Sequence, residues 1–149
     1  MIATDRRIPV PPWTIIVPQL MWLLSAFMFV CFGCLSSSTF NFSMAGFSVF
    51  LIVGLYLRWR VAFWLSALCY AVIVGYDIAK ILASVTPPPS AVLGAVISVA
   101  ILILHQKTTS MRWFGIERQR IIRFLFWLLS ALACVAYELW IIHFLAKPD

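Results

Sequence analysis

Four titratable side chains stand inside otherwise apolar stretches of the sequence: Asp77 and Lys80 in one stretch, Glu138 and His143 in another. Carboxylate, amine and imidazole groups in apolar segments can carry protons or ions. They can also neutralise one another and so fix how helices pack. The segments that carry these groups decide which of the two roles is open to them.

Asp77 and Lys80 belong to a regular pattern. Six residues follow one another at intervals of four, three, four, three and four, which is the spacing of one helix face: Ser66, Tyr70, Ile73, Asp77, Lys80 and Ser84. An unpaired charge in hydrocarbon costs about 3 kcal/mol or more. We therefore expect this face to contact protein rather than lipid, and the other segments to be arranged around residues 61–85.

The composition indicates an integral membrane protein. The chain has 149 residues, of which 64% are hydrophobic and 11% are charged, whereas soluble domains carry about 25% charged residues. Spans of roughly 20 residues each fill the whole length. We predict an all-α fold, a single transmembrane domain over residues 1–149, with spans at 13–35, 42–57, 61–85, 91–105 and 121–145.

The loop charges predict an orientation. Basic residues are enriched in cytoplasmic loops of membrane proteins, and in this parse they alternate from loop to loop. The N-terminus is therefore expected in the cytoplasm and the C-terminus outside, in the inner (cytoplasmic) membrane of the cell. A four-span alternative would break that alternation. The segments assigned to the inside contain Arg6, Arg7, Arg58, Arg60, Lys107, Arg112, Arg118 and Arg120.

The basic loop from 106 to 120 is the longest connection. Its charges, Lys107, Arg112, Arg118 and Arg120, stand beside Trp113 and Phe114. This combination suits contact with the anionic lipids of the inner leaflet or with a cytoplasmic partner. Contact with anionic lipids already explains basic residues in the loops of a membrane protein. The net charge of +6 therefore does not indicate nucleic acid as a partner.

In this topology, Asp77, Lys80, Glu138 and His143 all fall in the outer half of the membrane. We expect the third and fifth spans to be neighbours tied by Lys80 and Glu138, because pairing removes the cost of isolated charges. A packing clamp or a contact with a partner subunit's charges is favoured over a proton or ion relay. Groups near the surface are relieved by water and by snorkelling.

Small residues at every fourth position allow helices to approach closely. Such stripes occur at Ala67, Ala71 and Gly75 in the third span and at Ala91, Gly94 and Ser98 in the fourth. In the fifth span, Ser130 and Cys134 precede Glu138 on one face. These stripes are common in membrane helices, so they predict a bundle and not a function.

Cys31 and Cys34 form a C-x-x-C pair at the outer end of the first span. The pair resembles the motif of small membrane thiol oxidoreductases related to vitamin K epoxide reductase. That resemblance implies disulfide exchange with a partner or a quinone. Those enzymes need a second reactive pair, whereas Cys69 and Cys134 are single. No His pair stands at metal-binding spacing, so neither a metal nor another cofactor is expected.

With no soluble domain and no catalytic set in the sequence, we expect a non-enzymatic role. The preferred hypothesis is a small multi-pass subunit or accessory protein of a larger membrane complex. It would act by helix packing against partner subunits. The alternative is a small oligomeric transporter or channel that uses Asp77, Lys80, Glu138 and His143. A thiol–disulfide redox protein using Cys31 and Cys34 is the third hypothesis.

Overall fold

The computed structural model describes residues 10–36, 38–116 and 120–145. The described part is all-helical, with 88% of it in helices and no strand. The helices are α1 (Trp13–Ser36), α2 (Thr39–Tyr56), α3 (Arg60–Ala83), α4 (Pro89–Gln106), α5 (Thr108–Phe114) and α6 (Arg120–Leu145). All of them except α5 are long and apolar enough to cross a membrane, five in number. These five helices support a multi-pass membrane protein, which the composition also predicts.

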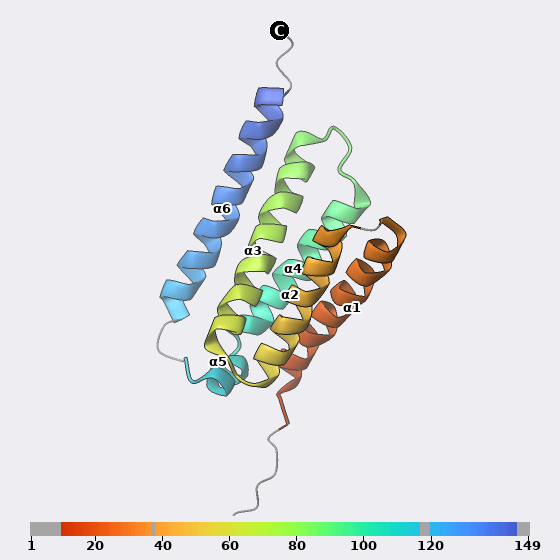
Figure 1. Cartoon of the computed structure of the whole chain (residues 1–149). Helices are drawn as coiled ribbons and strands as arrows, with labels where there is room; N and C mark the ends of the chain where they lie inside the picture. Colours follow the sequence, from red (N-terminus) through yellow and green to blue (C-terminus); the bar gives the residue numbers. More distant parts are fainter. Residues whose placement is uncertain (1–9, 37, 117–119, 146–149) are drawn as a thin grey trace, which may run out of the picture.

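Consecutive long helices run in opposite directions (Figure 1). The start of α1, the α2–α3 turn and α5 gather at one end of the bundle, which we call the α5 end. The α1–α2 and α3–α4 connections and the end of α6 gather at the opposite end. The first described residues and Leu145 therefore lie on opposite sides of the bundle, as five crossings require.

Prolines set the connection between α3 and α4. In a continuous helix the ring of Pro87 would clash with the carbonyl of Ala83, four residues earlier, and Ser84 has left the helix with φ −102° and ψ 133°. The third span thus ends at Ala83 rather than at Val85. α4 begins at Pro89, because a proline in the first turn gives up no helical hydrogen bond.

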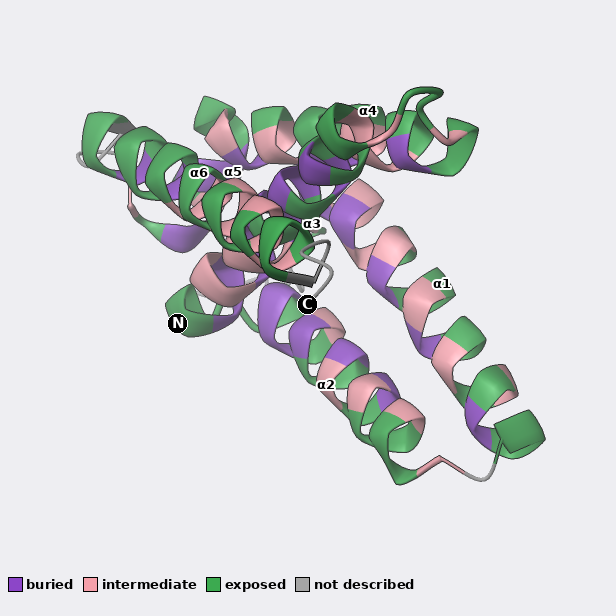
Figure 2. Cartoon of the chain, turned by 90° about the horizontal axis from the view of Figure 1, so that it is seen from above, coloured by how far each residue is buried: buried purple, intermediate pink, exposed green. Residues whose placement is uncertain are grey.

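α3 is the central helix. It packs against α2, α4 and α6, while α1 packs mainly on α2. Half of the span of α3 is buried, compared with 6% of the span of α6. Figure 2 shows the buried residues gathered around α3 and the exposed ones along the outer side of α6. The expectation that the chain is arranged around residues 61–85 is confirmed.

The basic loop contains a short helix that the sequence pattern does not predict. α5 turns Ser110, Met111 and Phe114 inward, and the ring of Phe114 lies 4.7 Å from that of Phe63. Phe114 is therefore a core residue and cannot contact a lipid surface. Gly115 ends the helix at φ 64°, a conformation that glycine adopts without steric cost.

Two of the small-residue stripes lie at helix contacts. Gly75 of α3 faces α6, where a Cβ at position 75 would lie 2.5 Å from the carbonyl oxygen of Ala131 and 2.7 Å from Cβ of Cys134. On the other side of α3, Gly94 of α4 lies against the Asp77 carboxylate. The third and fifth predicted spans are thus neighbours, as expected.

We predict that Gly75→Ala destabilises the bundle. The added methyl group would meet backbone and Cβ atoms that cannot rotate away, so the free energy of unfolding should fall by about 1–3 kcal/mol. Thermal unfolding in detergent measures the change. Gly46→Ala is the matched control, because a Cβ there meets nothing within 4 Å. Equal stability of the two variants would contradict the close contact of α3 with α6.

Candidate functional site

A buried polar network joins three helices toward the α5 end. The indole Nε1 of Trp22 (α1) donates to Ser66 Oγ (α3) over 2.9 Å. Ser66 Oγ lies 3.2 Å from His105 Nε2 (α4). His105 Nδ1 lies 2.9 Å from the carbonyl oxygen of Ile101. We call Trp22, Ser66 and His105 the His105 network; Ser66 and His105 have no exposed surface.

The direction of each hydrogen bond follows from its end groups. The Ile101 carbonyl can only accept, so His105 Nδ1 carries a hydrogen and donates it. Trp22 can only donate, so Ser66 accepts from it and gives its own hydrogen to Nε2 of a neutral His105. Each polar atom of the network has a partner inside the protein. The chain of bonds needs no water.

Aromatic rings enclose His105. The centroids of Phe63, Tyr70 and Trp127 lie 5.1, 6.2 and 6.4 Å from that of the imidazole. These rings come from α3 and α6, so the imidazole is shielded on the sides that α1 does not reach. The network is a satisfied polar core, which fixes how α1, α3 and α4 are rotated against one another.

This network is not predicted from the sequence, where neither Trp22 nor His105 belongs to a pattern that indicates a shared polar site. The available signal was Ser66, which stands on the predicted polar face of α3 and would need a partner if buried. Without the rotation of α1 and α4, no partner can be assigned from spacing alone.

Further polar contacts hold α5 against the bundle. The hydroxyl of Ser110 lies 2.8 Å both from Oγ1 of Thr14 and from the carbonyl oxygen of Leu104. Nε of Arg60 donates to the carbonyl oxygen of Phe114 over 3.2 Å. Arg123 of α6 is fully buried and donates to the carbonyl oxygen of Ile116 over 2.6 Å. The α5 end is thus closed by polar links to α1, α3 and α6.

Asp77 lies at the contact of α3 with α4, where the absence of a side chain at Gly94 makes room for its carboxylate. Its residue is 9% exposed. Within the described part of the chain, no hydrogen bond reaches the carboxylate; Lys80 attracts it electrostatically. Asp77 is thus a nearly buried acid whose only described polar neighbour is a cation one turn away.

Lys80 lies at the surface of α3, with its ammonium 4.2 Å from the ring centroid of Tyr76. It interacts electrostatically with Glu138 of α6 as well as with Asp77. Among the described residues, however, no salt bridge joins Lys80 to either carboxylate. The helices α3 and α6 are neighbours, as expected, but the described residues show no direct ion pair between Lys80 and Glu138.

His143 is exposed near the end of α6, and no contact in the described ranges joins it to Asp77, Lys80 or Glu138. The sequence-predicted cluster therefore reduces to Asp77, Lys80 and Glu138, which we call the Asp77 cluster. It lies where α3 meets α4 and α6, toward the end opposite α5.

Part of the predicted basic loop can be placed. The ammonium of Lys107 lies 5.5 Å from the ring centroid of Trp13, and Arg112 is exposed on α5. Arg118 and the side chain of Arg120 lie outside the described residues. The described members lie at the α5 end, where Arg58 also covers the ring of Trp113 at 4.0 Å.

The candidate redox pair, Cys31 and Cys34, lies one turn apart near the end of α1, and both thiols are free. Cys69 is half-buried in α3. Cys134 donates weakly to the carbonyl oxygen of Val72 over 3.4 Å. Across the described ranges, no three His, Cys, Asp or Glu side chains are placed to hold a metal ion. Comparisons with protein-family models, curated proteins and solved structures find no match to the chain.

We predict that Ser66→Ala destabilises the protein by about 1–3 kcal/mol, because it leaves the Trp22 N–H and His105 Nε2 buried without partners. Thermal unfolding in detergent measures the loss. Ser48→Ala is the control, since Ser48 is equally buried but donates only to Met44 of its own helix. A loss no larger at position 66 than at position 48 would show that the network does not hold the helices together.

Proposed function

We propose that the chain is a small subunit or accessory protein of a larger membrane complex and that α6 is the helix that packs against its partners. Inner-membrane insertion with the N-terminus in the cytoplasm is part of this proposal. The positions of Arg58, Arg60, Lys107 and Arg112 at the α5 end support that orientation, because basic residues collect on the cytoplasmic side.

The observation that carries the proposal is the one-sided packing of α6. Gly75 and Val72 of α3 meet α6 along one face. The rest of its surface is open over the full span, with 6% of the span buried. The open side carries large apolar residues: Leu125, Leu129, Leu132 and Trp140. Lipid can cover such a face, and so can another helix, which packs there by shape and van der Waals contact.

The Asp77 cluster supports partner contact beside that face. Lys80 is exposed at the surface of α3 and Glu138 is half-buried on α6, so the polar groups reach the outside of the bundle next to the open side of α6. Charged groups within a membrane favour pairing with other polar groups over contact with lipid. A partner helix carrying an acidic or amide side chain would satisfy Lys80.

The His105 network supports a structural role for the interior. Its groups are matched among themselves, and aromatic rings enclose the imidazole. A conduction path would need polar groups that exchange partners with water or with an ion. The interior of the bundle toward the α5 end is therefore suited to holding helices in register.

We predict that the protein co-purifies with a membrane partner in stoichiometric amount from mild detergent. Leu129→Trp, at the centre of the open face of α6, should reduce recovery of that partner about tenfold, because a bulky side chain prevents close helix packing. Quantitative mass spectrometry of the purified complex measures the ratio.

Leu24→Trp on α1 is the matched control, since Leu24 is 55% and Leu129 is 63% exposed. It should leave the ratio unchanged. Recovery of the protein alone, or equal effects of the two substitutions, would refute partner packing through α6.

One observation favours the alternative of a small oligomeric transporter or channel: Asp77 is nearly buried with no described hydrogen bond to its carboxylate. If that carboxylate carries protons or ions, Asp77→Asn should abolish flux into proteoliposomes and leave the thermal unfolding temperature nearly unchanged. If it is a packing group, the variant should lose stability and show no flux difference from the wild type.

A further inference from the structure

The turn between α2 and α3 holds an arginine in a conformation that favours glycine. Arg58 has φ 62° and is the one non-glycine residue with a positive φ in the described ranges. The N–H of Trp59 donates to the carbonyl oxygen of Gly54 over 2.8 Å, and that of Arg58 to the carbonyl oxygen of Leu55 over 3.4 Å. Such a pair of bonds ends a helix at a left-handed residue, a position that glycine fills without steric cost. The backbone therefore gives no reason for an arginine here.

The side chain of Arg58 supplies a reason. Its guanidinium lies 4.0 Å from the ring centroid of Trp113 on α5. Stacking of this kind holds the guanidinium in one orientation and leaves the N–H donors at the edge of its plane. Arg58 is exposed, and no described hydrogen bond or salt bridge uses those donors. The group is thus accessible and oriented to bind an anion with two parallel hydrogen bonds.

The surroundings of Arg58 are positively charged. The acidic residues in the part of the chain that the structure describes are Asp77 and Glu138, and both lie toward the opposite end of the bundle. Lys107 and Arg112 are exposed at the α5 end, as Arg58 is. Charges of one sign on one surface add their potentials, so this end favours an anionic ligand.

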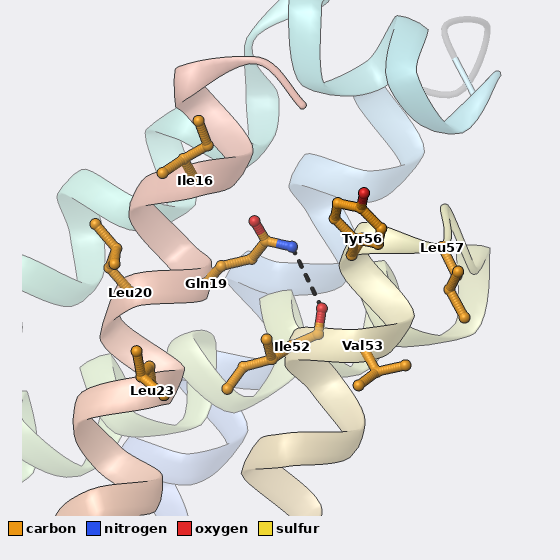
Figure 3. Close-up of a pocket in the computed structure, with 8 residues that line it drawn as sticks. All are labelled: Ile16, Gln19, Leu20, Leu23, Ile52, Val53, Tyr56 and Leu57. Atoms are coloured by element: carbon orange, nitrogen blue, oxygen red, sulfur yellow. Dashed lines mark hydrogen bonds between the residues drawn. The ribbon is translucent and has the colours of Figure 1, made fainter. Parts of the chain in front are cut away.

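An apolar groove between α1 and α2 begins at the same turn. Its volume is about 390 Å³, and its lining includes Leu57, the residue directly before Arg58. Figure 3 shows Gln19 crossing this groove from α1 toward α2. The Nε2 atom of Gln19 donates to the carbonyl oxygen of Ile52 over 3.3 Å. The amide is thus held by the protein, and the other residues that line the α1 side are aliphatic.

The groove extends from the α5 end toward the middle of the bundle. Ile16 and Leu23, at its two ends on α1, are about 10 Å apart at the helical rise. Leu20, Leu23 and Tyr56 are 57%, 56% and 46% exposed, so the groove opens sideways toward a surrounding bilayer. The hydroxyl of Tyr56 lies toward the same end of the groove as Ile16 (Figure 3). An occupant would therefore have its polar part at the α5 end and an apolar chain beyond it.

We propose that Arg58 and this groove bind an anionic phospholipid of the leaflet on the α5 side. The guanidinium donates to the phosphate oxygens, and the hydroxyl of Tyr56 donates to an ester carbonyl. One acyl chain lies in the groove along Leu20, Leu23 and Val53. The site requires insertion in a bilayer, as the proposed function does, but it is independent of whether α6 contacts a partner protein.

Charge and depth together select this occupant. Trp13 and Trp59 are 57% and 45% exposed at the α5 end, and exposed tryptophans mark the level of the lipid head groups. A lipid phosphate at that level is within reach of Arg58. A zwitterionic lipid would also bring an ammonium group to a surface that carries Lys107 and Arg112, which weakens its attraction. A soluble partner could meet the charges but could not fill a groove that lies along two membrane spans.

The test uses the full chain in nanodiscs that contain phosphatidylglycerol and phosphatidylcholine in equal amounts. In one preparation the phosphatidylglycerol carries a diazirine in an acyl chain, and in the other the phosphatidylcholine does. After illumination, tandem mass spectrometry locates the labelled residues. We expect phosphatidylglycerol to label the groove about tenfold more than phosphatidylcholine does, the effect of a charge-assisted hydrogen bond.

Arg58→Gly tests the contact with the head group, because glycine adopts the same φ and keeps the turn. Labelling of the groove by phosphatidylglycerol should fall to the level of phosphatidylcholine, with the unfolding temperature in detergent nearly unchanged. Lys80→Gln is the matched control. It also removes an exposed cation that lies over an aromatic ring, 4.2 Å from the centroid of Tyr76, but it does so toward the opposite end. It should leave labelling of the groove unchanged.

Leu23→Trp tests the groove by narrowing it and should reduce labelling by both lipids at least about threefold. Leu24→Trp is its control, because Leu24 is 55% exposed and does not line the groove.

Equal labelling of the groove by the two lipids in the wild-type protein would overturn the proposal. Equal effects of Arg58→Gly and Lys80→Gln, or of Leu23→Trp and Leu24→Trp, would do the same. A lower unfolding temperature of Arg58→Gly with the preference for phosphatidylglycerol intact would also overturn it, because Arg58 would then serve only to hold α5 through Trp113.

Discussion

Close approach of α3 to its neighbours is the constraint on which the bundle depends. In a bilayer the surrounding lipid is as apolar as the side chains, so helices associate through tight packing and polar contacts rather than through the hydrophobic effect. Gly75 brings the backbone of α6 near α3, and Gly94 makes room for the Asp77 side chain at α4. A side chain at position 75 would separate α3 from α6, and one at position 94 would displace the Asp77 carboxylate.

Polar groups divide the bundle into two regions. Toward the α5 end, the His105 network pairs within the protein, and the links of Ser110, Arg60 and Arg123 close that end. Toward the other end, Lys80 rests on Tyr76 and has no salt bridge among the described residues, while Asp77 lacks a described hydrogen bond. The polar contacts at the α5 end hold the helices of the fold together. At the opposite end, a polar group of another molecule that pairs with Lys80 or Asp77 would contribute the most binding free energy.

The number, type and order of the spans follow from the sequence because a bilayer requires long apolar segments with polar connections. The neighbourhood of α3 and α6 also follows, since charges at equal depth are expected to pair. The sequence does not reveal α5, whose seven residues give too short a pattern. Nor does it reveal the His105 network, because joining Trp22, Ser66 and His105 requires the rotation of three helices. For the same reason, Lys80 and Glu138 are placed at one height by the sequence but not in contact.

The attachment of α6 mainly to α3 bears on biosynthesis. A chain emerging from the ribosome presents α1 to α4 before α6, and the contacts of α1 with α2 and of α3 with α4 need nothing from the last helix. The face of α3 that carries Ala67, Ala71 and Gly75 remains open until α6 enters the membrane. The four-helix intermediate therefore exposes a surface of small residues to which another transmembrane helix could bind. Few residues separate α5 from α6 along the chain. Correct assembly thus depends on this short distance, because it lets α6 reach the open face of α3 before a helix of another protein does.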